Sequence, residues 1–344
     1  MFSQKSLFSL SRSFHARNKC VRFTHSATSH HQSNLINNSL RNLHYVSHKV
    51  ALSPNTTIHY LEYPKVGSAN ATQKKSSHQA TKTLVNIHGS YQTAFTFDDL
   101  VTSMDDLRPM HPLRVISVDL RGHGDSSWSQ HGTYTLQVLR EDIAKLMDKL
   151  DVENYYVLGE GLGSLVALDY ASSKGFTSDL NGLITVEVPS SPKKLQIYDR
   201  LRYNASFSSF EQFVDFCLQL NPNTTERSVR KRLEMAIRED PASGTWQWKR
   251  DPRFNFDKDI LQSEIEMLVE KIQGLASETK ILVVRGENSD VSSPKATEKL
   301  LDTLNDGVEG YKASSVTLPS AGHILHGDNP RLLAQTVLKF MNLL

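Results

Sequence analysis

Four short segments carry histidines, serines, carboxylates and glycines, the residue types that proton transfer and oxyanion stabilisation require. In chain order they are His88-Gly89-Ser90, Asp119–Ser126, Gly159–Gly163 and Ala321-Gly322-His323. Each comes after an apolar or β-branched run, so that the end of a strand would present it. A single His-Gly or Gly-His pair carries little information. Four such segments in this order, each at the end of a strand, form a specific pattern.

The glycine-rich segment Gly159–Gly163 could also be taken for a dinucleotide-binding loop. Such a loop needs the spacing G-x-G-x-x-G, and position 164 is a serine. The end of the next predicted strand offers only Glu187, a weak substitute for the acidic residue that binds the ribose. We therefore predict no nucleotide cofactor. The cysteine spacing likewise predicts no metal, and no motif predicts a prosthetic group.

Apolar and β-branched runs predict the strands that must position these segments. They are Thr57–Tyr63, Thr83–His88, Arg114–Asp119, Tyr155–Gly159, Leu183–Val188, Ile281–Arg285 and Ser315–Leu318. Continuous apolar runs suit strands buried on both faces of a parallel sheet. Amphipathic helical patterns alternate with them; one has the apolar stripe Leu136, Leu139, Ile143, Leu146, Met147 and Leu150, and the last begins at Asn329-Pro330. The sequence therefore predicts an α/β fold with one doubly wound, mostly parallel sheet.

One interval, about 190–278, interrupts the alternation because it contains no convincing strand. Its apolar residues predict helices, with Phe207, Phe210, Phe213, Phe216 and Leu218 in one and Val229, Leu233, Met235 and Ile237 in another. An insertion of this size before the penultimate strand predicts a helical lid. The alternative is a helical layer that only covers the sheet.

The order of the four segments resembles the α/β-hydrolase superfamily, and the resemblance covers roughly residues 49–344. Within it, the chain is similar to bacterial YbfF-type esterases, mitochondrial α/β-hydrolase-domain proteins and fungal ethanol acetyltransferases. In that group the triad acid follows the strand after the nucleophile, typically within Asp-x-x-Pro. The matching stretch here is Glu187-Val188-Pro189. The position used in many other hydrolases, Gly-x-x-Asp, reads Gly286-Glu287-Asn288-Ser289.

The resemblance also implies the site residues. The nucleophile position, Ser in Gly-x-Ser-x-Gly, is Gly161, which has no hydroxyl and cannot form an acyl-enzyme. Backbone N–H groups of Ser90 and Leu162 would form the oxyanion hole, and His323 would be the base. Glu187 would be its acid, with Asp290 as an alternative whose other explanation is a helix or turn cap. Ser164 comes three residues after the turn, inside the predicted helix, where a shifted nucleophile would point elsewhere.

Charge is unevenly distributed along the 344 residues, whose formal net charge is +2. No acidic residue precedes Glu62, whereas residues 1–61 carry seven Lys and Arg residues. Residues 1–48 are rich in Ser and Arg without acids, a composition typical of a mitochondrial transit peptide, with a basic tail as the alternative. The remainder is mildly acidic, which argues against nucleic-acid binding. No apolar run is long enough for a transmembrane span.

We thus expect a leader over residues 1–48 and one hydrolase-fold domain over 49–344, located in mitochondria, with the matrix as the expected compartment. The absent hydroxyl favours a catalytically degenerate protein that acts in binding or as a scaffold. The alternative is an ester or thioester hydrolase, or an alcohol acyltransferase, in which His323 and Glu187 activate water directly. In both cases the expected ligand is a small acyl ester or thioester; no protein partner can be named.

Overall fold

The computed structural model describes residues 43–67, 82–173, 179–189, 206–220, 224–255, 260, 262–310 and 313–344. Nearly all of the expected leader therefore lies outside the described residues, as do parts of the expected lid. The sheet begins at Val46, slightly before the expected start of the domain. In the part of the chain that is described, no helix combines the length and apolar character needed to cross a membrane.

The centre of the molecule is a mixed sheet of eight strands in the order β1-β2-β4-β3-β5-β6-β9-β10. The strands are β1 (Val46–Ser53), β2 (Thr56–Val66), β3 (Thr83–Ile87), β4 (Leu113–Val118), β5 (Tyr155–Glu160), β6 (Leu180–Val186), β9 (Ile281–Gly286) and β10 (Ala313–Leu318). β1 and β2 pair antiparallel with each other and β2 with β4, and the remaining pairings are parallel. The predicted α/β fold with a mostly parallel sheet is thus confirmed. β1 was not predicted because it is an edge strand with polar and half-buried residues.

The register of the parallel strands brings the expected site segments to one edge. Ile87 of β3 pairs with Gly159 of β5, and Glu160 pairs with Val186 of β6. On the far side, Gly286 of β9 pairs with Leu318 of β10. The residues that follow these strands therefore emerge side by side at the carboxyl edge, where open α/β sheets bind ligands.

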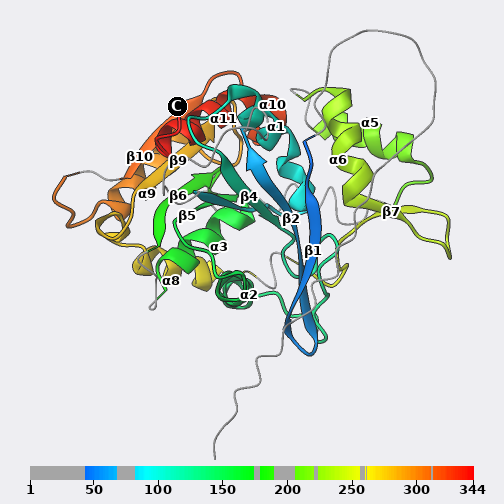
Figure 1. Ribbon diagram of the computed structural model, residues 1–344. Coiled ribbons are helices and arrows are strands. Elements are labelled where there is room, and N and C mark those ends of the chain that lie inside the picture. Colours follow the sequence, from blue (N-terminus) through cyan, green and yellow to red (C-terminus); the bar gives the residue numbers. More distant parts are fainter. Residues whose placement is uncertain are drawn as a thin grey trace, which may run out of the picture.

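Helices cover both faces of the sheet (Figure 1). One face packs on α2 (Leu136–Leu150), α3 (Leu162–Ala171), α8 (Gln262–Lys271) and α9 (Pro294–Leu304), with the short η2 (Leu275–Ser277) beside them. The other packs on η1 (Ala94–Phe97), α1 (Asp98–Leu107), α10 (Leu325–Asp328) and α11 (Pro330–Phe340). The predicted stripe of α2 is buried except at Leu150, which is half-buried. The side chain of Asn329 caps α11 by accepting from Leu332 N, as its sequence predicts.

The expected lid holds α5 (Phe210–Leu220), α6 (Glu226–Ala236), β7 (Ile237–Glu239) and β8 (Trp246–Trp248). It has a small apolar core of its own, formed by Phe213, Val214, Val229, Leu233 and Ile237. The expectation that this interval has no strand is wrong, since β7 and β8 form an antiparallel hairpin and Ile237 begins β7 rather than continuing a helix. Strands of three residues are too short to show a period-2 pattern in the sequence.

Candidate active site

The turn between β5 and α3 is the tightest part of the site. Gly161 occupies it with φ 54° and ψ −115° and donates its N–H to Val186 O at 3.0 Å. A Cβ on Gly159 would lie 2.2 Å from Gly163 O, and one on Gly163 would lie 2.1 Å from Ile87 O. A Cβ on Gly161 would instead have Gly89 Cα, at 3.7 Å, as its only neighbour within 4 Å. The packing therefore requires glycine on both sides of Gly161, whereas at Gly161 only the positive φ opposes a side chain.

Ser164, whose hydroxyl is the nearest to this turn in sequence, is hydrogen-bonded to the turn itself. Its Oγ donates to Gly161 O at 2.6 Å, and its N–H donates to the same oxygen at 3.0 Å. The side chain is fully buried. Ser164 is thus a structural residue of the first turn of α3.

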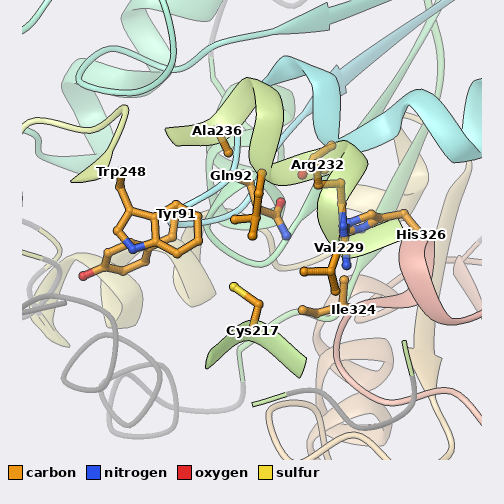
Figure 2. Close-up of a pocket in the computed structure, with 11 residues that line it drawn as sticks. Tyr91, Gln92, Cys217, Val229, Arg232, Ala236, Trp248, Ile324 and His326 are labelled. Atoms are coloured by element: carbon orange, nitrogen blue, oxygen red, sulfur yellow. Dashed lines mark hydrogen bonds between the residues drawn. The ribbon is translucent and has the colours of Figure 1, made fainter. Parts of the chain in front are cut away.

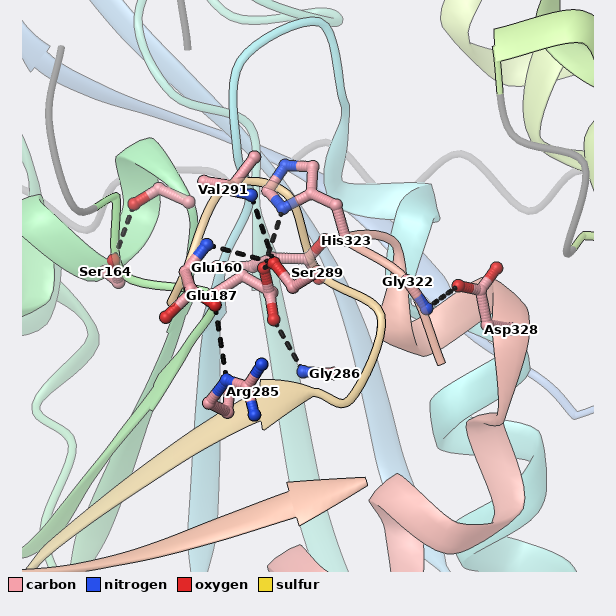
Figure 3. Close-up of polar contacts among 12 residues, drawn as sticks. Glu160, Ser164, Glu187, Arg285, Gly286, Ser289, Val291, Gly322, His323 and Asp328 are labelled. Atoms are coloured by element: carbon pink, nitrogen blue, oxygen red, sulfur yellow. Dashed lines mark hydrogen bonds and ion pairs between the residues drawn. The ribbon is translucent and has the colours of Figure 1, made fainter. Parts of the chain in front are cut away.

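An imidazole and a carboxylate meet beside the turn (Figure 3). His323 follows β10, and its Nδ1 lies 3.1 Å from Oε2 of the fully buried Glu187, which follows β6. Because an ionised carboxylate only accepts hydrogen bonds, the proton of His323 sits on Nδ1 and the lone pair on Nε2. The structure thus brings the two expected residues together and places Asp290, the alternative acid, in an exposed position.

The Glu187 carboxylate is held from several sides. Its Oε1 accepts from Gly286 N at 2.6 Å, and its Oε2 accepts from Ser289 Oγ as well as from His323. Ser289 stands where many hydrolases of the implied superfamily have their acid, so here that position supports Glu187. Glu187 itself has φ 54°, an uncommon conformation for a non-glycine residue.

The two expected oxyanion donors flank the same turn. Ser90 follows β3, and Leu162 is the first residue of α3, where N–H groups have no partner inside the helix. Gly89 is fixed because its N–H donates to Gln92 Oε1 at 2.8 Å. The buried Ser90 Oγ has no hydrogen-bond partner among the residues that the structure describes.

His88 braces this loop in its neutral form. Leu120 N donates to its Nε2 at 3.0 Å, so Nδ1 carries the proton and donates to Gly89 O at 2.7 Å. Burial lowers the pKa of His88, against the opposing charge of Asp119. A neutral imidazole with both nitrogens engaged serves structure rather than proton transfer.

A second imidazole–carboxylate pair was missed in the sequence. Nδ1 of His326 lies 2.6 Å from Oε2 of Glu160, and both side chains are buried. Burial raises the pKa of Glu160, but the charge and hydrogen bond of His326 and the hydrogen bond from Gln92 outweigh it, so this pKa lies below its usual value. Glu160 stands between two glycines of the turn, and His326 comes three residues after His323, which is the only signal in the sequence. Of the pair, His326 lines a pocket under α5 and α6 (Figure 2).

No metal site accompanies these residues. Within the described ranges, no three His, Cys, Asp or Glu side chains are grouped so that they could hold a metal ion. The groups that the structure brings together at the site are the imidazole of His323, the carboxylate of Glu187 and nearby backbone N–H groups.

Known proteins share this architecture. The esterase Rv0045c of Mycobacterium tuberculosis is 25% identical over 266 residues, which are 74% of this chain and 80% of that protein. The probable protein phosphatase methylesterase 1 of Caenorhabditis elegans is 23% identical over 242 residues, 68% of this chain and 63% of that protein. Among solved structures, Rv0045c matches with a TM-score of 0.64 at 22% identity, over 89% of this chain and 94% of that one. E-2-(acetamidomethylene)succinate hydrolase matches with a TM-score of 0.68 at 18% identity, over 87% and 100%.

The family model described as alpha/beta hydrolase fold matches residues 82–330, which include every strand of the sheet except β1 and β2. The strand order, the turn at Gly161 and the residues at the carboxyl edge agree with that match. The chain belongs to the alpha/beta hydrolase fold family.

Proposed function

We propose that this chain is a hydrolase-fold protein of mitochondria that binds a small acyl ester or thioester without forming an acyl-enzyme. The observation that carries the proposal is Gly161, which occupies the strand-to-helix turn where this fold presents its nucleophilic serine. A glycine supplies no hydroxyl, so covalent catalysis has no starting atom. Ser164 does not replace it, because its hydroxyl is buried and bonded to the turn.

Esters are the ligand class that the relatives favour. The matched proteins include an esterase and a probable methylesterase. An ester carbonyl would meet the N–H groups of Ser90 and Leu162, which the hydrolase resemblance implies as oxyanion donors, beside the glycine at 161. Binding of an ester at this edge of the sheet is therefore compatible with the absence of a nucleophile. A scaffold function would use the same ligand-bound state.

A second candidate is hydrolysis by activated water. It is favoured by the intact pair His323–Glu187, whose carboxylate is held by Gly286 N and Ser289 Oγ. His323 Nε2 would take a proton from water while the hydroxide attacks the acyl carbon. The oxyanion would be stabilised by backbone N–H groups, and the departing alcohol or thiol would receive the proton. An alcohol in place of water would give acyl transfer.

A serine-directed fluorophosphonate and a panel of short acyl esters and acyl-CoA thioesters separate these functions. Under both proposed functions the fluorophosphonate should leave the wild type unlabelled. Turnover that disappears in His323→Ala, with ligand binding retained, supports activated water. Binding without turnover in either protein supports the degenerate function. Stoichiometric labelling of the wild type would refute both, since it requires a serine nucleophile.

The mitochondrial location is a separate proposal that is supported by the acid-free, Arg- and Ser-rich start of the chain. A fluorescent fusion of the full chain should colocalise with a mitochondrial marker, and a fusion that begins at residue 49 should not. Equal distribution of the two fusions would refute the proposal that residues 1–48 direct the chain to mitochondria.

A further inference from the structure

The pocket under α5 and α6 has two chemically different ends. It is a small pocket with a cavity volume of about 60 Å³, and it is partly open to solvent. Arg232 and His326 lie at one end, and the rings of Tyr91 and Trp248 lie at the other, with their centroids 6.0 Å apart (Figure 2). Cys217 lies between the ends.

The pocket shares its wall with the candidate active site. Gln92 lines it and connects two parts of that site, because its Oε1 accepts from Gly89 N at 2.8 Å and its Nε2 donates to Glu160 Oε1 at 3.1 Å. Glu160 directly precedes Gly161. Ile324, another lining residue, directly follows His323.

Arg232 of α6 supplies the positive charge of the pocket and has donors to spare. Its Nε donates to Ser228 O, its Nη1 to His326 Nε2 and its Nη2 to Thr224 Oγ1, each at 3.2 Å. A guanidinium has five N–H donors, so two remain after these three contacts. Since Nη1 can only donate, His326 accepts at Nε2 and its Nδ1 proton is directed to Glu160.

The nearby carboxylates are engaged with other groups. Glu160 is bonded to His326, Asp99 accepts from Lys231 Nζ at 2.8 Å and Ser228 Oγ at 2.9 Å, and Asp328 accepts from Gly322 N at 2.8 Å. In the part of the chain that is described, none of them forms an ion pair with Arg232. Burial lowers the pKa of Arg232, so the surrounding anions do not offset its loss of solvent.

The backbone makes room for this guanidinium. A Cβ on Gly327 would lie 2.6 Å from Arg232 Nη1. Glycine at 327 therefore lets α10 lie close to the end of the Arg232 side chain. A carboxylate is the natural partner of the spare donors, because guanidinium N–H groups match its two oxygens.

We propose that this pocket binds the carboxylate of an organic acid with a short apolar or aromatic body. The carboxylate accepts from Arg232, and the body lies along the apolar wall toward Trp248. Together with the proposed function, on which this extension rests, the ligand is an acyl compound that also carries a free carboxylate, such as a half-ester of a dicarboxylic acid. The carboxylate end would lie at Arg232 under the lid, and Gln92, which bonds both Gly89 and Glu160, connects this pocket with the turn at Gly161.

Calorimetric titration with acids and their neutral amides tests the charge recognition without any catalysis. The probes are benzoate, phenylacetate and 3-phenylpropionate, each against its primary amide. We expect the acids to bind the wild type about 10- to 100-fold more tightly than the amides, the range for bonds to a charged group. Arg232→Met should abolish this preference. Arg230→Met, on the same helix but exposed and paired with Glu211 and Glu226, should keep it.

The comparison of acids with amides in the wild type needs no variant, so it remains valid even if Arg232→Met fails to fold. In that case Gly327→Ala, which places a Cβ close to Arg232 Nη1, is the second perturbation. The proposal would be overturned if the wild type bound acids and amides equally, or bound no acid at about 1 mM. It would also be overturned if Arg232→Met kept the preference for acids, or if Arg230→Met lost it equally. Monoethyl succinate against diethyl succinate separates the two proposals: if acids bind but neither ester does, the carboxylate site stands and the ester function fails.

Discussion

Replacing Gly161 by serine would place a hydroxyl at the turn where the proposed function expects the nucleophile to be missing, and the structure allows the consequences to be worked out. Apart from the adjacent residues, the new Cβ would have one neighbour within 4 Å among the described residues, Gly89 Cα at 3.7 Å, so the Cβ itself displaces no neighbour. The cost is conformational, since φ is 54°. A non-glycine residue in such a region costs about 1–3 kcal/mol. For a domain of this size that lowers Tm by roughly 2–5 °C.

The gain is catalytic if the rest of the site is in place. His323 and Glu187 are already bonded at 3.1 Å, and Ser90 and Leu162 flank the turn. Loss of a triad serine costs up to about 10⁶ in kcat in a serine protease, and an unoptimised site recovers only part of this. We expect Gly161→Ser to hydrolyse short acyl esters at least ~10²-fold faster than the wild type and to react with a fluorophosphonate.

Gly161→Ala is the matched control because it carries the same Cβ and the same strain but no hydroxyl. The two variants should lose the same stability in thermal melts, and only the serine variant should be labelled. The double variant Gly161→Ser/His323→Ala should lose the acquired hydrolysis. A folded serine variant that is neither labelled nor faster than the alanine variant would refute the reasoning, since the pocket would then differ from a hydrolase at more than one residue.

Three further predictions concern stability. Ser289→Ala removes a donor from the buried Glu187 and should lower the free energy of unfolding by about 1–3 kcal/mol; an unchanged urea midpoint would contradict this. Burial raises the pKa of Asp119, but the hydrogen bond and charge of the buried His59 outweigh burial and hold the pKa of Asp119 below 3.8. The stabilisation from ionised Asp119 is therefore present above about pH 4 and is lost as the pH falls further. Asp119→Asn should therefore lose about 3 kcal/mol at pH 7, with a smaller difference from wild type below pH 4, and a difference independent of pH would refute the assignment. Leu146→Ala, in the core, should cost about 2–5 kcal/mol in urea unfolding, whereas Leu344→Ala, with its side chain 43% exposed, should cost less than 1 kcal/mol; equal losses would contradict the core position.

The parts of the fold that depend on long apolar runs could be predicted from the sequence. All seven predicted strands exist, and those buried along their whole length, such as β5 and β9, are recognised by their apolar runs. The edge strand Val46–Ser53 and the short lid hairpin escape prediction, since neither has a continuous apolar face. Ends were less certain: the sixth strand begins at Leu180, before the predicted Leu183, because polar and small residues open it.

The candidate site likewise contains residues that the sequence predicted and residues that it did not. His323 and Glu187 could be named because the resemblance to α/β-hydrolases implies these positions after the strands, and the register of the parallel sheet brings those strand ends together. Arg232, in contrast, sits on an amphipathic helix with many charged residues, and nothing in its local pattern distinguishes it from the exposed Arg230. Only the packing of α6 near Gly327 of α10 identifies it.

The presence of an intact acid–base pair beside Gly161 does not by itself argue for catalysis. Glu187 joins three segments, because its carboxylate bonds Gly286 at the end of β9, Ser289 in the following loop and His323 after β10. Removing it would leave buried donors unsatisfied, at about 1–3 kcal/mol each. The pair therefore has a structural role that needs no nucleophile, while glycine at 161 avoids the strain that a serine would add. Stability alone accounts for both features, so the kinetic effect of His323→Ala, measured where folding is unchanged, is the observation that decides between a binding protein and a water-activating hydrolase.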